Sequence, residues 1–95
     1  MSRYNEVGRH CTSVFTEDGW TKVVYHRTTV VKFNREYVIL NSGGWHTNTT
    51  KLRMNQAANQ YGLGYGVYQK DWQWYVTFPD GTEKEFFDGM IIERR

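Results

Sequence analysis

The stretch from Asn41 to Tyr61 constrains the fold more than any other part of the chain, because it is the only run with the character of a helix. The rest of the sequence alternates between strand-forming residues and tight turns. Four small or apolar residues recur at the i, i+3, i+4 and i+7 spacing of one helix face: Met54, Ala57, Ala58 and Tyr61. We therefore predict a single helix that packs on a sheet by this face.

Both ends of this helix are marked in the sequence. Three residues of the types that cap a helix start stand in a row: Thr47, Asn48 and Thr49. Gly62 suits the left-handed conformation that commonly follows a helix. The pair Gly43 and Gly44 allows positive φ angles where the chain leaves a strand. The helix should begin among the three cap residues and stop at Gly62.

The remaining sequence predicts short strands joined by turns. We place strands at 10–16, 20–24, 26–33, 36–40, 72–78, 83–87 and 90–93, with a further short run at 67–69. Asp18-Gly19 and Pro79-Asp80-Gly81 have the composition of hairpin turns. In the run 72–78, apolar residues alternate with polar ones, which predicts that Trp72, Trp74, Val76 and Phe78 form a core face. The predicted class is α+β: a small antiparallel sheet of about five to seven strands with a single helix inserted mid-chain.

Length and composition set further bounds. The 95 residues are enough for one domain, 1–95, without room for a second core. Residues 1–8 are polar, and we expect them to fray. Aromatic residues make up 17% of the chain, so some rings should remain on the surface, where aromatics favour contacts with partners. We expect Trp45, Tyr68 and Tyr75 to be accessible.

Several site types find little support. Cys11 is the only cysteine, which excludes an internal disulfide and a cysteine-rich zinc site. No pair among Cys11, His10, His26 and His46 has the spacing of zinc ligands, and we expect neither a metal nor a cofactor. The first residues lack the apolar region of a signal peptide, and no apolar run approaches the ~20 residues of a membrane span. We expect a soluble, intracellular protein that does not bind membranes.

Positive charge is concentrated in the middle of the chain. Residues 21–70 contain one acid, Glu36, and seven cations: Lys22, Arg27, Lys32, Arg35, Lys51, Arg53 and Lys70. Residues 71–95 contain three cations and six acids: Asp71, Asp80, Glu83, Glu85, Asp88 and Glu93. A basic middle suits nucleic acids, nucleotides and other phosphates as partners. The alternative is that these cations only protect strand edges from aggregation.

The helix start is the best candidate for a site. Free N–H groups and the positive end of the helix dipole favour an anion there, by roughly 0.3–1 kcal/mol per charge. Acids normally occupy a first turn, so Lys51 and Arg53 suggest that an external anion supplies the negative charge. The alternative is that one threonine caps the helix and Trp45 packs into the core. The candidate ligand-binding residues are Ser42, Gly43, Gly44, Trp45, His46, Thr47, Thr49, Thr50, Lys51 and Arg53, with His26, Thr28 and Tyr68.

Two histidines invite an enzymatic interpretation. Pairs of His-x-Thr elements on facing strands can cleave phosphodiesters, with one histidine as the base and the other as the acid. His26-x-Thr28 has this form, but the second element reads His46-Thr47 and precedes a helix. A phosphodiesterase is therefore the minor alternative, and we assign no catalytic residue.

Residues 40–56 also resemble a motif of known proteins. They read Leu-Asn-Ser-Gly-Gly-Trp-His-Thr-Asn-Thr-Thr-Lys-Leu-Arg-Met-Asn-Gln. This run is similar to a family of small tailed-phage proteins in which Ser-Gly-Gly-Trp precedes x-Thr-x-Thr-Thr-Lys-x-Arg-Met-Asn. The resemblance spans about 25–91, and His26-Arg27-Thr28 stands where relatives carry His-Gly-Thr. It implies a phage origin and the cytoplasm of a bacterial host, and it implies no particular activity.

Three main hypotheses follow. The first is a non-enzymatic phage protein that captures a phosphate-bearing ligand, in its sharpest form a nucleotide immune signal of the host, and that works as a homo-oligomer. The second is a nucleic-acid-binding accessory protein that uses the basic region 21–70. The third is a protein–protein inhibitor of a host enzyme, anchored by Leu52 and the accessible aromatic rings.

Overall fold

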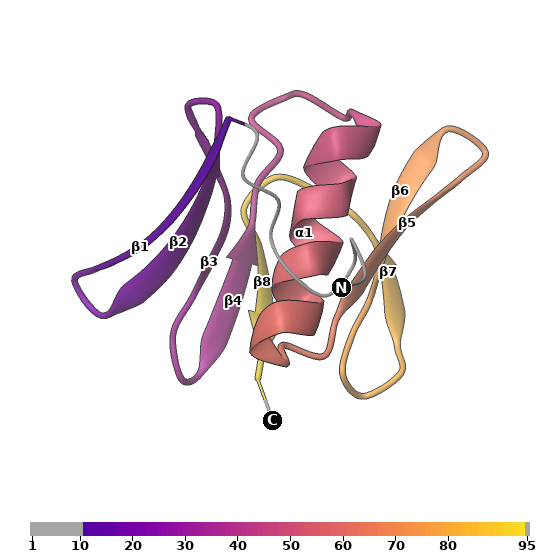
Figure 1. The fold of residues 1–95 in the computed structure, drawn as a ribbon. Coiled ribbons are helices and arrows are strands. Elements are labelled where there is room, and N and C mark those ends of the chain that lie inside the picture. The colour runs from indigo at the N-terminus through magenta and orange to yellow at the C-terminus, as the bar shows by residue number, and fades with distance from the viewer. Residues whose placement is uncertain (1–10, 95) are drawn as a thin grey trace.

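The computed structural model describes residues 11–94 of the chain. It contains one helix and eight strands within these residues, which confirms the α+β class with a single mid-chain helix (Figure 1). In chain order the elements are β1 (Thr12–Glu17), β2 (Trp20–Tyr25), β3 (Thr28–Phe33), β4 (Tyr37–Leu40), α1 (Asn48–Tyr61), β5 (Gly66–Lys70), β6 (Gln73–Thr77), β7 (Glu83–Glu85) and β8 (Met90–Glu93).

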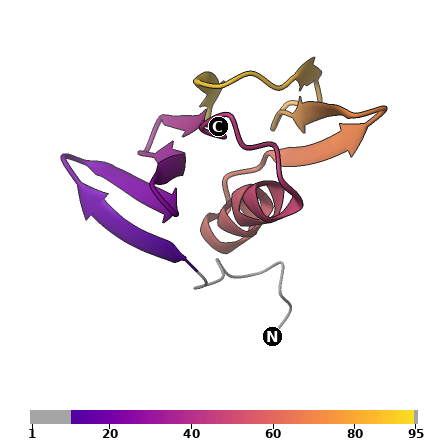
Figure 2. The ribbon, with the colours of Figure 1, turned by 90° about the horizontal axis from the view of Figure 1, so that it is seen from above.

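The strands divide into two antiparallel sheets. The first has five strands in the order β1-β2-β3-β4-β8, and the second has three in the order β5-β6-β7. The last strand therefore returns to the first sheet and pairs with β4, with Leu40 opposite Met90. The helix α1 lies between the sheets and contacts β2 and β3 on one side and β5 on the other (Figure 2).

The helix has the ends that the sequence predicts. Thr47 is the N-cap, in extended conformation, and its hydroxyl accepts a hydrogen bond from the Thr50 N–H at 3.2 Å. At the other end Gly62 adopts the left-handed conformation, with φ 63° and ψ 41°. The predicted core face is confirmed, because Met54, Ala57 and Ala58 are buried and Tyr61 is half-buried.

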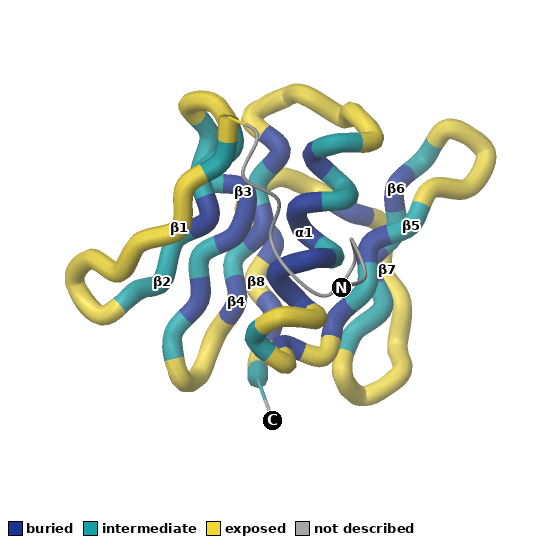
Figure 3. Tube along the Cα trace, in the orientation of Figure 1, coloured by how far each residue is buried: buried dark blue, intermediate teal, exposed yellow. Residues whose placement is uncertain are grey.

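The core lies where the helix meets both sheets (Figure 3). Its fully buried members come from both sheets and the helix, and include Val23, Val31, Leu40, Met54, Trp74, Val76 and Ile92. Polar side chains fix the helix within it. The Asn55 amide donates to the Val67 carbonyl at 2.9 Å and accepts from the Val67 N–H at 2.8 Å, so it pairs with β5 as a strand neighbour would.

The structure corrects several predicted strand boundaries, and the predicted strand 83–87 ends at Glu85. The predicted strand 26–33 begins at Thr28, because His26 has a φ of 56° and belongs to the turn between β2 and β3. The predicted strand 72–78 spans Gln73–Thr77, so the prediction of Trp72 as a core residue is wrong. Trp72 lies in the turn between β5 and β6, with its side chain 92% exposed.

The first strand begins at Thr12, whereas His10 and the predicted frayed segment 1–8 lie outside the described residues. Within residues 11–94, α1 is too short and too polar to cross a lipid bilayer.

Candidate ligand-binding pocket

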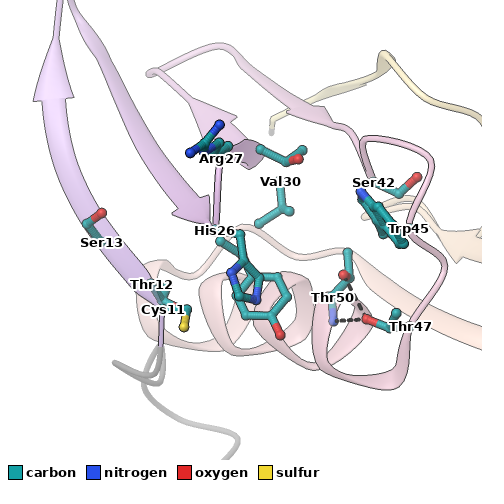
Figure 4. Close-up of a pocket in the computed structure, with 12 residues that line it drawn as sticks. Cys11, Thr12, Ser13, His26, Arg27, Val30, Ser42, Trp45, Thr47 and Thr50 are labelled. Carbon is teal, nitrogen blue, oxygen red and sulfur yellow. Dashed lines mark hydrogen bonds between the residues drawn. The ribbon is translucent and has the colours of Figure 1, made fainter.

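An open pocket of about 900 Å³ lies beside the start of the helix (Figure 4). Residues at the start of β1 form one side of it, and the loop between β4 and α1 forms the other, with the β2–β3 turn between them. Twelve residues line it: Cys11, Thr12, Ser13, Tyr25, His26, Arg27, Thr28, Val30, Ser42, Trp45, Thr47 and Thr50. Six of them are hydroxyl-bearing serines or threonines, so the lining is rich in hydrogen-bonding groups.

Strand pairing builds the first wall. Tyr25 at the end of β2 lies opposite Thr12 of β1 and opposite Thr28 of β3, so these three side chains share one face of the sheet. The His26 N–H donates to the Cys11 carbonyl at 2.7 Å, which fixes the following turn against β1. That turn presents His26 and Arg27 at the pocket edge, and both side chains are exposed.

The loop between β4 and α1 builds the second wall by packing tightly on β3. Gly43 has a φ of 65°, and a Cβ at this position would collide with the Thr28 hydroxyl and lie 2.8 Å from its methyl carbon. Only glycine allows this approach with this backbone conformation. Beyond it, Trp45 stands at the pocket mouth with 68% of its side chain exposed. The alternative that Trp45 packs into the core is therefore wrong.

Ser42 is held from the far end of the chain. Its N–H and its hydroxyl both donate to Asp88 Oδ1, at 2.8 Å and 2.7 Å. Burial alone would raise the pKa of Asp88, but the two bonds from Ser42, the nearby His46 and the Gly44 N–H outweigh it and lower the pKa below its ordinary value. Ser42 is 1% exposed, so its main effect is to position the loop.

The helix start is closed by a threonine cap. The hydroxyls of Thr47 and Thr50 are 3.0 Å apart and form one hydrogen bond, and Thr50 is buried. Capping by one threonine, Thr47, is thus confirmed. Because the Thr47 and Thr50 hydroxyls bond to each other, the helix start offers an anion fewer free hydroxyls than the sequence predicted. Thr49 and Lys51 are half-buried and do not line the pocket. Within residues 11–94, Lys51 forms no ion pair.

Arg53 lies behind the pocket wall. Only 7% of the residue is exposed, and its Nε donates to the Thr12 hydroxyl at 3.0 Å. Its Nη1 donates to Gln56 at 3.1 Å, and the guanidinium lies 5.8 Å from the centre of the Tyr25 ring. No carboxylate among residues 11–94 lies within ion-pair distance of it. This buried cation raises the local potential next to Thr12 and Tyr25, which line the pocket.

The comparisons with known proteins give one result. A model of the family described as the Kyanoviridae Gp96 protein matches residues 1–93. The chain belongs to this phage protein family. No curated protein and no solved structure matches it. The predicted phage origin of this Gp96-family chain is therefore confirmed, and the family description names no activity.

Several predicted site residues of the Gp96-family chain lie outside the pocket lining. Gly43 and Gly44 shape the loop, and His46 stacks on Trp74 with ring centres 4.6 Å apart. Tyr68 belongs to the second sheet, where it stacks on Tyr75. His26 alone of the two histidines lines the pocket, so the structure does not assemble them as an acid–base pair.

The structure also adds lining residues that the sequence did not identify as site residues: Cys11, Thr12, Ser13, Tyr25, Arg27 and Val30. Arg27 lies between His26 and Thr28, which were both predicted as site residues. A prediction of a turn at 26–27 would therefore have identified Arg27 as a lining residue. The start of β1 gave no signal, because its position depends on pairing with β2. Within residues 11–94, no cluster of three or more histidine, cysteine or acidic residues could hold a metal ion.

Proposed function

We propose that this phage protein is a non-enzymatic binding protein that captures a small phosphate-bearing ligand in the pocket beside the helix start. The observation that carries the proposal is the composition of that pocket. Hydroxyl groups, His26 and Arg27 line one open volume, and the exposed indole of Trp45 stands at its mouth. Hydroxyl and guanidinium donors suit phosphate oxygens.

The charges around the pocket favour binding of an anionic ligand. Arg27 is an exposed cation on the rim, and Arg53 is a buried cation behind the wall. The carboxylate of Asp88 approaches the same loop, but it accepts both Ser42 donors and so is directed at the protein itself. Within residues 11–94 Arg27 forms no ion pair, so its donors can bind an external phosphate.

The size and the aromatic lining favour a nucleotide. A volume of about 900 Å³ falls in the range of small-molecule sites, about 300–1,000 Å³. The Trp45 ring offers a stacking surface of the kind that holds a base. The sharpest form of the proposal is a nucleotide immune signal of the host, which the protein would sequester in the bacterial cytoplasm as a homo-oligomer.

The distribution of the other cations favours this ligand over a nucleic acid. Lys22 pairs with Glu17 at 2.8 Å, and the Lys32 amine lies 4.9 Å from the centre of the Trp20 ring. Lys22 and Lys32 lie opposite each other on the first sheet, whereas Arg53 is buried and Lys70 belongs to the second sheet. The cations in the basic middle of the sequence are therefore divided among separate parts of the fold. A nucleic-acid binder needs a continuous basic surface.

Calorimetric titration with a panel of nucleotides and cyclic dinucleotides tests the proposal. We expect saturable heat with at least one of them, and at least tenfold weaker binding in Arg27→Ala and in Trp45→Ala. Lys70→Ala is the matched control, because it removes an equal charge from the β5–β6 hairpin, and its affinity should stay unchanged. A panel without any heat, or equal weakening by the control, would contradict the proposal.

Recovery of the ligand separates capture from catalysis. Bound ligand released by heating should have the mass of the ligand supplied, both for the wild type and for His26→Ala. Cleaved product that disappears in His26→Ala would instead assign a phosphodiesterase.

A further inference from the structure

Two hairpins of this protein use the same turn with different residues. The β1–β2 turn is Asp18-Gly19, with φ angles of 54° and 82°, and the β5–β6 turn is Asp71-Trp72, with φ angles of 52° and 69°. Two residues with positive φ make a type I′ turn, which favours glycine at its second position. A left-handed backbone is disfavoured for a residue with a Cβ. Trp72 thus occupies a position where glycine would be more stable.

The side chain of Trp72 does not offset this cost by burial in the core. It is 92% exposed, the largest exposed fraction among the large apolar side chains described. An indole kept in water on a strained turn is not explained by stability, and such outliers concentrate at functional positions. Tryptophan is also the residue most typical of binding hot spots.

The sheet next to Trp72 has an outer face with a defined chemistry. Val67, Trp74 and Val76 are buried in the core, so the alternate residues of these strands point away from it. On this outer face Tyr68 lies opposite Tyr75, and Tyr75 lies opposite Glu85. The two tyrosine rings stack with centres 5.6 Å apart.

Negative charge accompanies these rings. Glu83 and Glu85 on β7 are exposed, and neither forms an ion pair with another residue of the described range. The Tyr68 hydroxyl donates to Glu83 at 2.7 Å, which fixes the ring beside the carboxylate. Aromatic faces attract cations, and two carboxylates beside them add to that attraction.

We propose that this outer face, which carries the stacked Tyr68 and Tyr75 beside Glu83 and Glu85, docks a protein partner that presents arginine side chains. A guanidinium stacks on an aromatic ring and pairs with a carboxylate through two parallel hydrogen bonds, which lysine cannot do. Trp72 would supply an apolar anchor from the turn at the end of the β5–β6 hairpin. The site is separate from the pocket and takes a ligand of opposite charge.

A hexa-arginine peptide is the probe for this face, followed by NMR of the tryptophan indole and tyrosine ring signals. We expect saturable shifts at Trp72, Tyr68 and Tyr75, with hexalysine several-fold weaker and hexaglutamate without effect. Tyr75→Ala and the double variant Glu83→Gln, Glu85→Gln should each weaken binding about tenfold. The double variant Glu36→Gln, Glu93→Gln removes the same charge elsewhere and should bind as the wild type does.

Trp72→Gly separates binding from folding. It should raise Tm by about 4–8 °C, because the turn then matches Asp18-Gly19, and it should weaken hexa-arginine binding at least tenfold. Unchanged peptide affinity in Trp72→Gly, or equal shifts of the Tyr37 ring signals opposite Glu93, would overturn the proposal. Self-association of the protein that Trp72→Gly abolishes would assign the face to a second copy and also overturn it. Nucleotide binding by Trp72→Gly reports on the pocket alone, so the two proposals fail separately.

Discussion

Asp88 accepts two hydrogen bonds from Ser42 through a single carboxylate oxygen, Oδ1, although the residues are 46 positions apart. The Gly89 N–H next to it donates to the Leu40 carbonyl at 2.8 Å. The connection between β7 and β8 is therefore fastened to the loop that lines the pocket. The C-terminal segment sets the position of one pocket wall without lining the pocket itself.

Asp88→Ala should lower the free energy of unfolding by about 1–3 kcal/mol, because it leaves the buried Ser42 N–H and hydroxyl without their acceptor. Urea denaturation followed by circular dichroism measures the change. Glu36→Gln is the control, since Glu36 is exposed, and it should shift stability by less than about 0.5 kcal/mol. Equal stabilities of Asp88→Ala and the wild type would show that water replaces the carboxylate without cost.

The lowered pKa of Asp88 predicts a loss of stability in acid. The folded state holds the ionised form, so its contribution is complete above the unfolded pKa of about 3.9 and is lost as the pH falls through the lower folded value. We therefore expect the stability difference between the wild type and Asp88→Asn to be constant from pH 5 to 8. It should shrink below about pH 4. A difference that stays the same down to pH 2 would contradict the assigned shift.

The helix could be predicted closely because its signals are local. The cap at Thr47, the stop at Gly62 and the spacing of Met54, Ala57 and Ala58 all act within a few residues of the chain. The same holds for the turn Asp18-Gly19. Each signal specifies a backbone conformation that the tertiary structure then keeps.

Only half of the pocket lining could be predicted, because the other half depends on contacts between segments that are distant in the sequence. The loop wall lies next to the helix start in sequence, and Ser42, Trp45, Thr47 and Thr50 were all identified. The other wall exists because β1 pairs with β2, and the division into two sheets exists because β8 returns to β4. Such long-range pairings leave no local pattern. Trp72 was wrongly predicted to lie in the core, because the alternation of apolar and polar residues in β6 continues into the preceding turn.

Gly43→Ala should destabilise the protein by about 1–3 kcal/mol and weaken ligand binding in the pocket. The new methyl group would collide with Thr28, in addition to the cost of a positive φ for alanine. The two effects can be separated with Gly44→Ala, because Gly44 also has a positive φ but has no atom within 4 Å of its Cβ position.

The contact itself is tested by combining Gly43→Ala with Thr28→Ala, which removes the colliding atoms. Unfolding experiments on the single and double variants give the coupling energy, and we expect the double variant to recover part of the loss. If Gly43→Ala and Gly44→Ala cost the same amount, the close approach to Thr28 contributes nothing.

Asn55 offers the sharpest test of how the helix is fixed to the second sheet, since its amide both donates to and accepts from Val67. Asn55→Ala should cost about 2–3 kcal/mol at every pH, because it removes both hydrogen bonds. Asn55→Asp keeps the acceptor but places a carboxylate against the Val67 carbonyl, so it should cost more at pH 7. Protonation restores a donor, and the folded state then favours the protonated form, so the deficit relative to the wild type should shrink as the pH falls toward 4. Urea unfolding of all three proteins at pH 4 and pH 7 measures these differences, and a deficit of Asn55→Asp that does not change with pH would show that the side chain does not donate to Val67.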